Sequence, residues 1–199
     1  MQRIIKATEA LIDAIGTEGF AQTLSDALQR LAPFDYTVIF GYLGAARPMD
    51  LFDDFPRGKR KVFVEDYQEG PYLLDPFYLA CGNKVEPGLY RIKDLAPDRF
   101  FQGEYFRSYY ARTGLAEEIG YFIEMPGGAT VVVSLMRAER LFLLRNSGSL
   151  VNSGLWCAQS ASGIGATLRP GLGQMPRQHL MPACTRASNW PLPILAKVF

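Results

Sequence analysis

The stretch that organises this chain is residues 67–122, which reads YQEGPYLLDPFYLACGNKVEPGLYRIKDLAPDRFFQGEYFRSYYARTGLAEEIGYF. It holds most of the tyrosines of the 199-residue chain and mixes Phe and Tyr densely with Asp, Glu and Arg. Such a mixture suits the wall of a pocket that is apolar in body and polar at a few points. The composition therefore favours a sensor over a catalyst.

The charge balance of the chain changes near Arg140. Residues 1–140 carry 16 Lys and Arg against all 20 Asp and Glu, whereas residues 141–199 carry five basic residues and no carboxylate. The later stretch also holds both Trp, the single His and two of the three Cys. With 48% hydrophobic residues there is ample material for a buried core. We therefore expect a domain over residues 1–140 and an atypical tail over residues 141–199.

The chain lacks the sequence features of a membrane or secreted protein. No uninterrupted apolar run reaches about 18 residues, and the first helix pattern has acidic residues and no small-residue cleavage site. The cysteines at positions 81, 157 and 184 have neither disulfide nor zinc-ligand spacing. We expect a cytoplasmic protein with reduced thiols.

The first third of the sequence predicts two helices and a hairpin. Apolar residues recur at helical spacing over residues 4–15 and 20–31, and each pattern is followed by Gly or Pro. The β-branched and aromatic run YTVIFGYL at residues 36–43, with residues 47–52 after a Gly-Ala-Ala turn, predicts paired strands. Pro56 suits the first position of a further helix that carries Val62, Phe63 and Tyr67.

The second third predicts a long irregular section and then a second hairpin. After Gly70-Pro71 the turn residues favour a loop up to Pro97, and helical character returns over residues 102–112 until Gly114. Residues 115–125 and 129–136, joined by Pro-Gly-Gly, form the clearest hairpin. We predict an α+β fold with an antiparallel sheet of four or more strands flanked by helices, a sensor sandwich of the GAF or PAS type.

Residues 18–137 resemble the N-terminal sensor domain of LuxR-type helix-turn-helix transcription regulators. The resemblance rests on YLLDPFYLA, PGLYRIKDLAPDRFF and EYFRSYYARTGLAEEIGYF, which follow in the family's order. It implies an autoinducer-binding-like fold, a small-molecule signal, a homodimer, and contact with DNA only through a C-terminal helix-turn-helix domain. In lactone-binding members an aromatic residue, the Asp of an Asp-Pro step and a later Trp line the pocket. The corresponding positions here are Tyr67, Asp75 and Tyr90.

Two features distinguish this chain from the lactone binders. Residues 1–140 contain no Trp, and the spacing from Tyr67 to Asp75 is about one residue short for the family. An acyl-homoserine lactone is thus one candidate ligand among others. The chain looks closer to members whose similar sensor has no known signal.

The residues themselves leave alternatives open at each candidate position. Asp75 either caps a short helix begun by Pro76 or pairs with a ligand donor. The tyrosines either pack in the core with their hydroxyls at the surface or line a pocket, and our candidates are Tyr67, Tyr72, Tyr78, Tyr90 and Tyr105, with Tyr109 and Tyr110 weighed beside them. Glu117 and Glu118 open a strand, where one of them should point inward if alternation holds, but we expect a pair of exposed edge charges.

Catalysis, cofactors and metals find no support in the sequence. The only histidine, His179, lies in the tail, and no GxGxxG, GxxxxGK[ST], HExxH or GxSxG motif occurs. We expect a protein that is not an enzyme and that holds no cofactor or metal.

The tail carries neither the Thr-x-Arg-Glu opening nor the Ile-Ala step of the family's DNA-binding domain. Two interpretations of residues 141–199 remain: translation out of frame after a frameshift near residues 140–146, or a native divergent extension. The function is correspondingly that of a signal-sensing or dimerisation domain without its DNA-binding head. The alternative is a stand-alone module that forms heterodimers with full-length regulators and modulates them.

Overall fold

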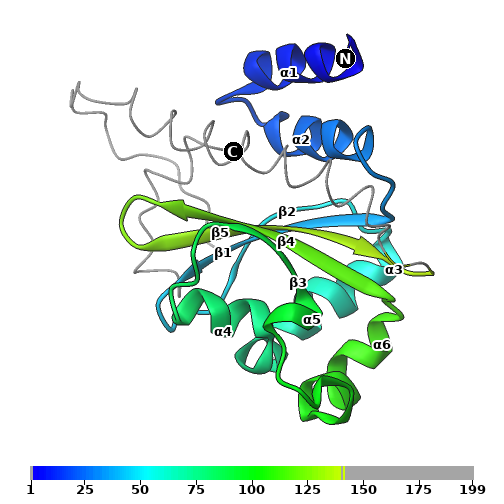
Figure 1. Ribbon diagram of the computed structural model, residues 1–199, viewed down its shortest axis with the longest axis vertical. Helices are drawn as coiled ribbons and strands as arrows, with labels where there is room; N and C mark the ends of the chain where they lie inside the picture. Colours follow the sequence, from blue (N-terminus) through cyan, green and yellow to red (C-terminus); the bar gives the residue numbers. More distant parts are fainter. Residues whose placement is uncertain (1, 140, 142–199) are drawn as a thin grey trace.

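A five-stranded antiparallel sheet forms the middle layer of the molecule, with helices on both faces (Figure 1). The computed structural model describes residues 2–139 and residue 141. The strands lie in the order β2-β1-β5-β4-β3. Their bounds are β1 Tyr36–Leu43, β2 Met49–Asp53, β3 Gly88–Arg91, β4 Glu117–Met125 and β5 Ala129–Arg137. The predicted α+β class, both hairpins and the antiparallel sheet are confirmed.

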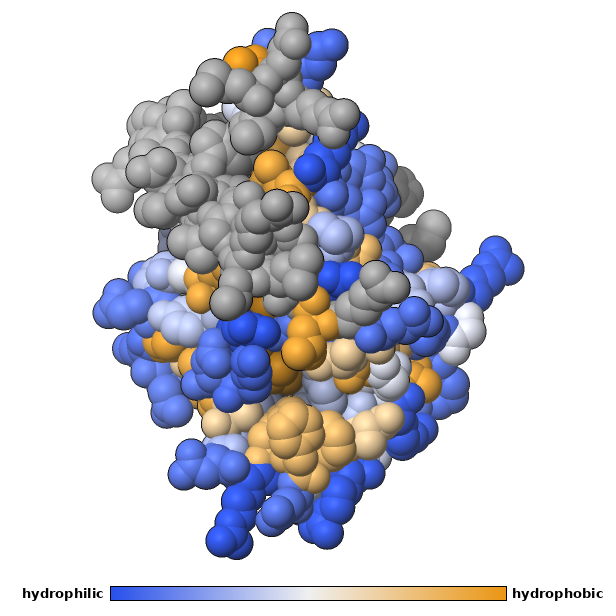
Figure 2. All heavy atoms as spheres, turned by 45° about the vertical axis from the view of Figure 1, so that its right-hand side comes forward, coloured by the Kyte–Doolittle hydropathy of each residue, from blue (hydrophilic) through white to orange (hydrophobic). Residues whose placement is uncertain are grey.

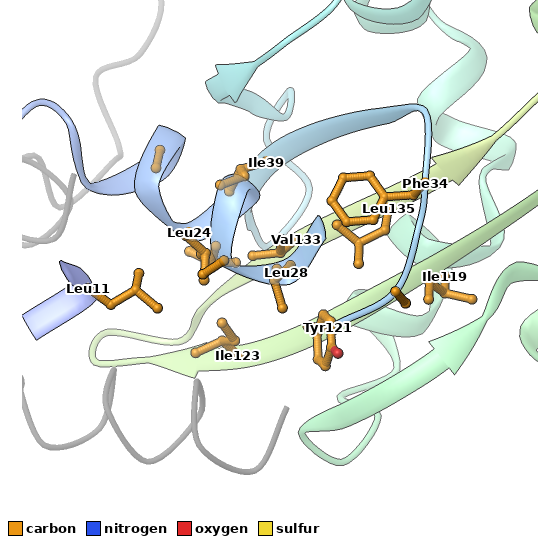
Figure 3. Packing of buried hydrophobic residues seen from close by; sticks show 14 of the residues in the cluster. Leu11, Leu24, Leu28, Phe34, Ile39, Ile119, Tyr121, Ile123, Val133 and Leu135 are labelled. Atoms are coloured by element: carbon orange, nitrogen blue, oxygen red, sulfur yellow. The ribbon is translucent and has the colours of Figure 1, made fainter. Parts of the chain in front are cut away.

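Helix α2 (Phe20–Gln29) covers one face of the sheet, and α1 (Gln2–Ala14) packs on the outer side of α2. Leu11, Leu24 and Leu28 pack there against strand residues that alternate along β4 and β5, such as Ile123 and Val133 (Figure 3). Because successive strand residues point to opposite faces, the intervening residues of β4 and β5 face the other helical layer. The predicted amphipathic helices thus supply this layer.

Short helical segments cover the opposite face and carry most of the aromatic residues. The regular ones are α3 Arg57–Arg60, α4 Pro76–Gly82, α5 Ile92–Leu95 and α6 Ala111–Thr113. The chain forms π-helical turns at η1 (Lys61–Asp66) and η4 (Phe106–Tyr110) and 3-10 turns at η2 (Pro71–Leu74) and η3 (Phe100–Gln102). The predicted helix before Gly114 is present, and Gly114 ends it with a left-handed φ of 69°.

The prediction of a long irregular section after Gly70-Pro71 is wrong. It contains η2, α4, β3 and α5, and β3 pairs with β4 from Gly88↔Phe122 to Arg91↔Ile119. These elements are too short to show a helical or strand period in the sequence. Segments of this length depend mainly on packing against the rest of the fold for their stability. Pro56 is also corrected: it precedes the helix in an extended conformation, with φ −55° and ψ 145°.

The expectation that Glu117 and Glu118 are exposed edge charges is wrong. The two side chains are 3% and 7% exposed, because β4 is an inner strand between β3 and β5. Glu117 is held by an ion pair with Arg91 of β3, whose Nε donates to its Oε1 at 2.5 Å. Glu118 points to the opposite face, beneath the aromatic helices.

On the face shown in Figure 2, the described residues are mainly hydrophilic, and apolar residues are exposed at several places. The large apolar side chains that are exposed include Ile5 and Ile12 of α1, Leu79 of α4 and Phe101. Within the described residues, no helix combines the length and the apolar character that a membrane span requires.

Gly120 of β4 fixes the distance between α4 and the sheet. A Cβ atom at this position would lie 2.9 Å from Cε2 of Phe77 and 3.0 Å from Cγ1 of Val132. The Phe77 ring, which is 1% exposed, therefore rests directly on the strand backbone.

We predict that Gly120→Ala lowers the free energy of unfolding by about 1–3 kcal/mol, the usual cost of overpacking a core. Gly58→Ala is the matched control, since Gly58 lies in α3 and a Cβ there meets nothing within 4 Å. Urea denaturation of both variants measures the difference. Equal stability of the two variants would show that Phe77 does not hold α4 against β4.

Candidate functional site

An inner cavity lies between the sheet and the aromatic helices. Its empty space is about 20 Å³, room for a single water molecule or a group of similar size. The lining comprises apolar residues and a group of polar side chains, namely Tyr42, Tyr67, Asp75, Tyr105, Tyr109, Tyr110, Thr113, Glu118 and Ser134. The cavity is thus small, and many hydroxyl and carboxyl groups line it.

A chain of buried hydrogen bonds forms one wall of the inner cavity. The Tyr67 hydroxyl donates to Oδ2 of Asp75 at 2.5 Å, and the hydroxyls of Tyr42 and Tyr67 lie 3.0 Å apart. Because a phenol has a single proton to donate, Tyr42 must be the donor to Tyr67. Burial, together with the nearby Asp75 carboxyl, raises the pKa of both tyrosines well above its usual value.

The two carboxyl oxygens of Asp75 have different roles: one caps a helix and the other faces the cavity. Its Oδ1 accepts a hydrogen bond of 2.9 Å from the Phe77 amide, so it caps α4 as one of the two sequence interpretations predicted. Its Oδ2 faces Tyr67 and the cavity. Burial raises the pKa of Asp75 to about 6, although the bonds from Tyr67 and Phe77 act in the opposite direction.

Glu118 is a second buried carboxyl in the same cavity. It lies on β4 opposite Met136 of β5, and the Ser134 hydroxyl is its hydrogen-bond partner. Burial is the main cause that raises the pKa of Glu118 to about 8, and the Asp75 charge adds to it. Two carboxyls that disfavour each other's ionisation are typical of functional sites.

The π-helical turn η4 presents consecutive tyrosines to the cavity. Tyr109 and Tyr110 are each 4% exposed, and Tyr105, just before the turn, is 7% exposed. The Tyr110 hydroxyl is buried and has no hydrogen-bond partner among the described residues. Burial raises the pKa of all three. Turns of this type occur frequently at functional sites, and an unpaired buried hydroxyl marks a place where a ligand could bind.

The structure brings together only part of the predicted site. Tyr67, Asp75 and Tyr105 line the inner cavity. Tyr72 and Tyr78 are half-buried beside it, with the Tyr72 ring centroid 6.2 Å from that of Tyr67 and the Tyr78 centroid 6.0 Å from that of Tyr42. Tyr90 lies apart on β3, where its hydroxyl donates to the Glu86 carbonyl at 2.9 Å and its ring meets Phe122. The ligand-binding roles of these residues stay predictions.

Sequence reasoning missed Tyr42, which strand alternation could have indicated, since it shares a face with Val38 and Phe40. Alternation did indicate that one of Glu117 and Glu118 points inward, but the exposed arrangement was preferred; Glu118 shares a face with Phe122. Tyr109 and Tyr110 were weighed but not chosen, and their hydroxyls are buried rather than at the surface.

A larger outer cleft of about 370 Å³ opens at the end of the sheet. Its lining includes the end of α4 and the following loop, with Cys81, Lys84, Val85 and Pro87, and the turn between β4 and β5. Tyr42 lines both the outer cleft and the inner cavity. Among the described residues, no group of three or more His, Cys, Asp or Glu side chains is placed to hold a metal ion.

Two solved structures share this arrangement of helices and strands. The LBD domain of VqsR from Pseudomonas aeruginosa is 24% identical with a TM-score of 0.66, and the match covers 77% of this chain and 90% of that one. CepR2 from Burkholderia cenocepacia, an N-acylhomoserine lactone dependent LuxR family transcription factor, is 19% identical with a TM-score of 0.59, covering 80% and 93%. The chain has the fold of a LuxR-type ligand-binding domain.

The LuxR-type fold confirms the resemblance that the sequence indicated for residues 18–137. No protein-family model matches the chain, and no curated protein matches its sequence.

We predict that the protein is more stable at pH 5 than at pH 8. Asp75 and Glu118 have raised pKa values in the folded state, so the folded protein binds their protons more tightly than the unfolded chain. The two carboxyls stabilise the folded protein fully below their ordinary pKa values, 3.8 for Asp75 and 4.5 for Glu118. This stabilisation is lost as the pH rises through their raised pKa values, about 6 for Asp75 and about 8 for Glu118. Between pH 5 and pH 8 the raised pKa of Asp75 acts over about one pH unit and that of Glu118 over about two and a half, so we expect a loss of up to roughly 5 kcal/mol, measured by urea denaturation.

Glu118→Gln tests the source of this pH dependence. Glutamine copies the neutral carboxyl, so the variant should be more stable than the parent at pH 8 and should lose less stability between pH 5 and pH 8. The control is Glu124→Gln, which removes an exposed carboxylate from the same strand. If both variants keep the parent's pH dependence, the buried carboxyls are not its cause.

Proposed function

We propose that residues 2–139 form the signal-sensing domain of a LuxR-type transcription regulator, which binds a small molecule at the inner cavity. The LuxR-type fold supports the class of protein. The observation that carries the binding role is the buried row of Tyr42, Tyr67 and Asp75 with Glu118 beside it. Polar groups of this kind are costly to bury, and a pocket for a ligand explains why they lie within an apolar layer.

Binding would shift the balance between two arrangements of the aromatic helices. The inner cavity is far smaller than the 300 Å³ or more of an ordinary ligand pocket, so a ligand must displace aromatic side chains to enter it. Of the aromatic residues that line the cavity, Phe63 lies on η1 and Tyr109 and Tyr110 lie on η4. These segments are short, which makes their movement less costly than movement of the sheet. In an intact regulator such a movement would change how DNA-binding domains are presented to their half-sites.

DNA would be reached only through a helix-turn-helix domain. The described residues form one layered α+β unit and include no such domain. Residues 142–199, with the hypothesis of out-of-frame translation, lie outside the described residues. As the resemblance to the LuxR family implies, we place the protein in the cytoplasm.

We predict that a panel of small amphiphiles includes at least one that stabilises the protein. The panel holds acyl-homoserine lactones, the ligand class of CepR2, together with alkyl alcohols, amides and amines. At 100 times its dissociation constant a ligand adds about 2.7 kcal/mol, which raises the melting temperature of a domain this size by roughly 5–10 °C. Thermal denaturation with each compound measures the effect.

Asp75→Asn locates the binding site. Asparagine also caps helices well, so α4 should persist, whereas a ligand donor that pairs with the carboxylate should lose about tenfold or more in affinity. The control is Asp98→Asn, in an exposed turn. A panel without any stabilising compound, or binding that Asp75→Asn leaves unchanged, would contradict sensing at the inner cavity.

The alternative function is a stand-alone module that pairs with other regulator chains, and an exposed stripe on α1 favours it. Ile5 and Ile12 are 51% and 58% exposed, while Ala7 and Leu11 on the same helix are buried against α2. Helix α1 therefore has one apolar side in the core and further isoleucines outside it. The same stripe could serve the homodimer that the resemblance implies.

We predict that Ile12→Lys weakens self-association by about tenfold or more, because a buried isoleucine contributes about 1.5–3 kcal/mol. Sedimentation equilibrium over a range of protein concentrations measures it. Leu79→Lys is the control, since Leu79 is 46% exposed on α4 beyond the opposite face of the sheet. A monomeric parent protein, or equal effects of both changes, would exclude α1 as the interface.

A further inference from the structure

The inner cavity contains two carboxyls, and none of the described residues that line it is a Lys or Arg. Asp75 and Glu118 are 5% and 7% exposed, and both line the cavity. No Lys or Arg is among the lining residues, and no ion pair in the described part of the chain includes either carboxyl. The nearby Arg112 lies at the surface, 58% exposed, where it faces Asp66 at 3.5 Å. The two acidic groups therefore have no positive partner among the residues that the structure describes.

Aromatic rings surround these carboxyls on the helical side. Phe40 and Tyr67 have ring centroids 5.0 Å apart, and Tyr67 and Tyr109 are 5.7 Å apart. Rings that face a cavity attract cations through their negative faces, and they do so more strongly where water is excluded. The Tyr110 hydroxyl, buried and without a partner in the described part of the chain, is free to accept a hydrogen bond.

We propose that the inner cavity selects ligands that carry a protonated amine, which Asp75, Glu118 and Tyr110 receive within the aromatic wall. The inference rests on the proposed sensing function and names the chemical class of its ligand. An ammonium group is about the size of the 20 Å³ space and offers several donors to the carboxyl and hydroxyl oxygens. A neutral lactone or alcohol leaves both acidic groups without a counter-charge.

The remainder of the ligand has room in the outer cleft. Tyr42 lines both spaces, so a ligand that occupies both would pass beside its side chain. Val85, Pro87 and Phe122 give the cleft apolar surface. An alkyl chain attached to the ammonium group would therefore extend past Tyr42 toward the end of the sheet.

Binding of an amine should release protons from the protein. The pKa values of Asp75 and Glu118 are raised by burial, and a positive charge between them lowers both. The other titratable groups around them stay neutral up to pH 8, because burial also raises the pKa of Tyr42, Tyr67, Tyr105, Tyr109 and Tyr110, and that of Cys81 to about 12. Affinity for an amine should thus rise between pH 5.5 and pH 8, and these two carboxyls alone should supply the protons.

The test compares compounds that differ in charge and little in shape. Hexylamine, charged at either pH because its pKa is close to the value of about 10.4 for lysine, is titrated calorimetrically into the full chain beside 1-hexanol and N-hexanoyl homoserine lactone. We expect hexylamine to bind about tenfold or more tightly than 1-hexanol, as charge-assisted hydrogen bonds are the stronger ones. Repeating the titration in buffers of different ionisation enthalpy measures the released protons.

Two variants locate the amine. Glu118→Gln should abolish most of the preference for hexylamine and reduce the proton release, and thermal denaturation checks that it folds. Glu18→Gln removes an exposed carboxylate that lines neither space, and it should leave both quantities unchanged. Glu124→Gln removes the carboxylate that lines the outer cleft and so tests whether the amine binds there instead.

Three results would overturn the inference. Equal or tighter binding of 1-hexanol or the lactone would exclude an amine ligand while leaving the sensing function in place. A preference lost in Glu124→Gln but kept in Glu118→Gln would place the amine in the outer cleft. Failure of all three compounds to bind would overturn the amine class, and the separate panel with Asp75→Asn decides whether the domain senses a small molecule at all.

Discussion

The Asp75 carboxyl joins three parts of the structure that are distant in sequence. One oxygen caps α4 through the Phe77 amide, and the other accepts the Tyr67 hydroxyl, which in turn accepts that of Tyr42 on β1. Helix α4, the end of the helix that carries η1 and the central sheet are thereby held around one buried acidic group. A carboxyl in this position is costly unless its lone pairs are occupied, so the bonds that satisfy it also fix the aromatic wall of the cavity.

Gly120 allows α4 to lie close to the sheet, which the hydrogen bonds of Asp75 also require. Without a side chain at this position, Phe77 rests on β4, and the start of α4 comes close enough for Asp75 to reach the cavity that Glu118 lines. The protein thus buries two carboxyls on one side of the sheet that form no ion pair among the described residues, whereas the buried Glu117 carboxyl on the side of α1 and α2 is paired with Arg91 within a mainly apolar core. Departures from good core packing that gather on one side of a fold usually belong to its function. This asymmetry separates the layer that supports the domain from the layer that is able to respond to a ligand.

Local signals in the sequence were sufficient where an element is long enough to show its period. The hairpins β1–β2 and β4–β5 and the helices α1 and α2 follow from alternation, turn residues and helical spacing. The elements between Pro71 and Leu95 could not be predicted in this way, because segments of four to seven residues contain too few positions to show a periodic pattern. Glu118 was misjudged for a related reason: a carboxylate is normally exposed, and only the pairing of β3 with β4 converts that strand from an edge to an interior one.

The sequence by itself determined the α+β class, the order of the principal helices and strands, the resemblance to LuxR-type sensor domains, and Asp75 as a residue of interest. Each of these depends on neighbours along the chain or on a recognisable order of motifs. The tertiary structure alone decided which tyrosines meet Asp75, that Tyr90 lies apart from them, and that Glu118 shares their cavity. Those facts depend on the order and register of the strands and on how closely the helices pack against them. Distances across a sheet and the removal of water from a carboxyl arise only when segments far apart in sequence come together.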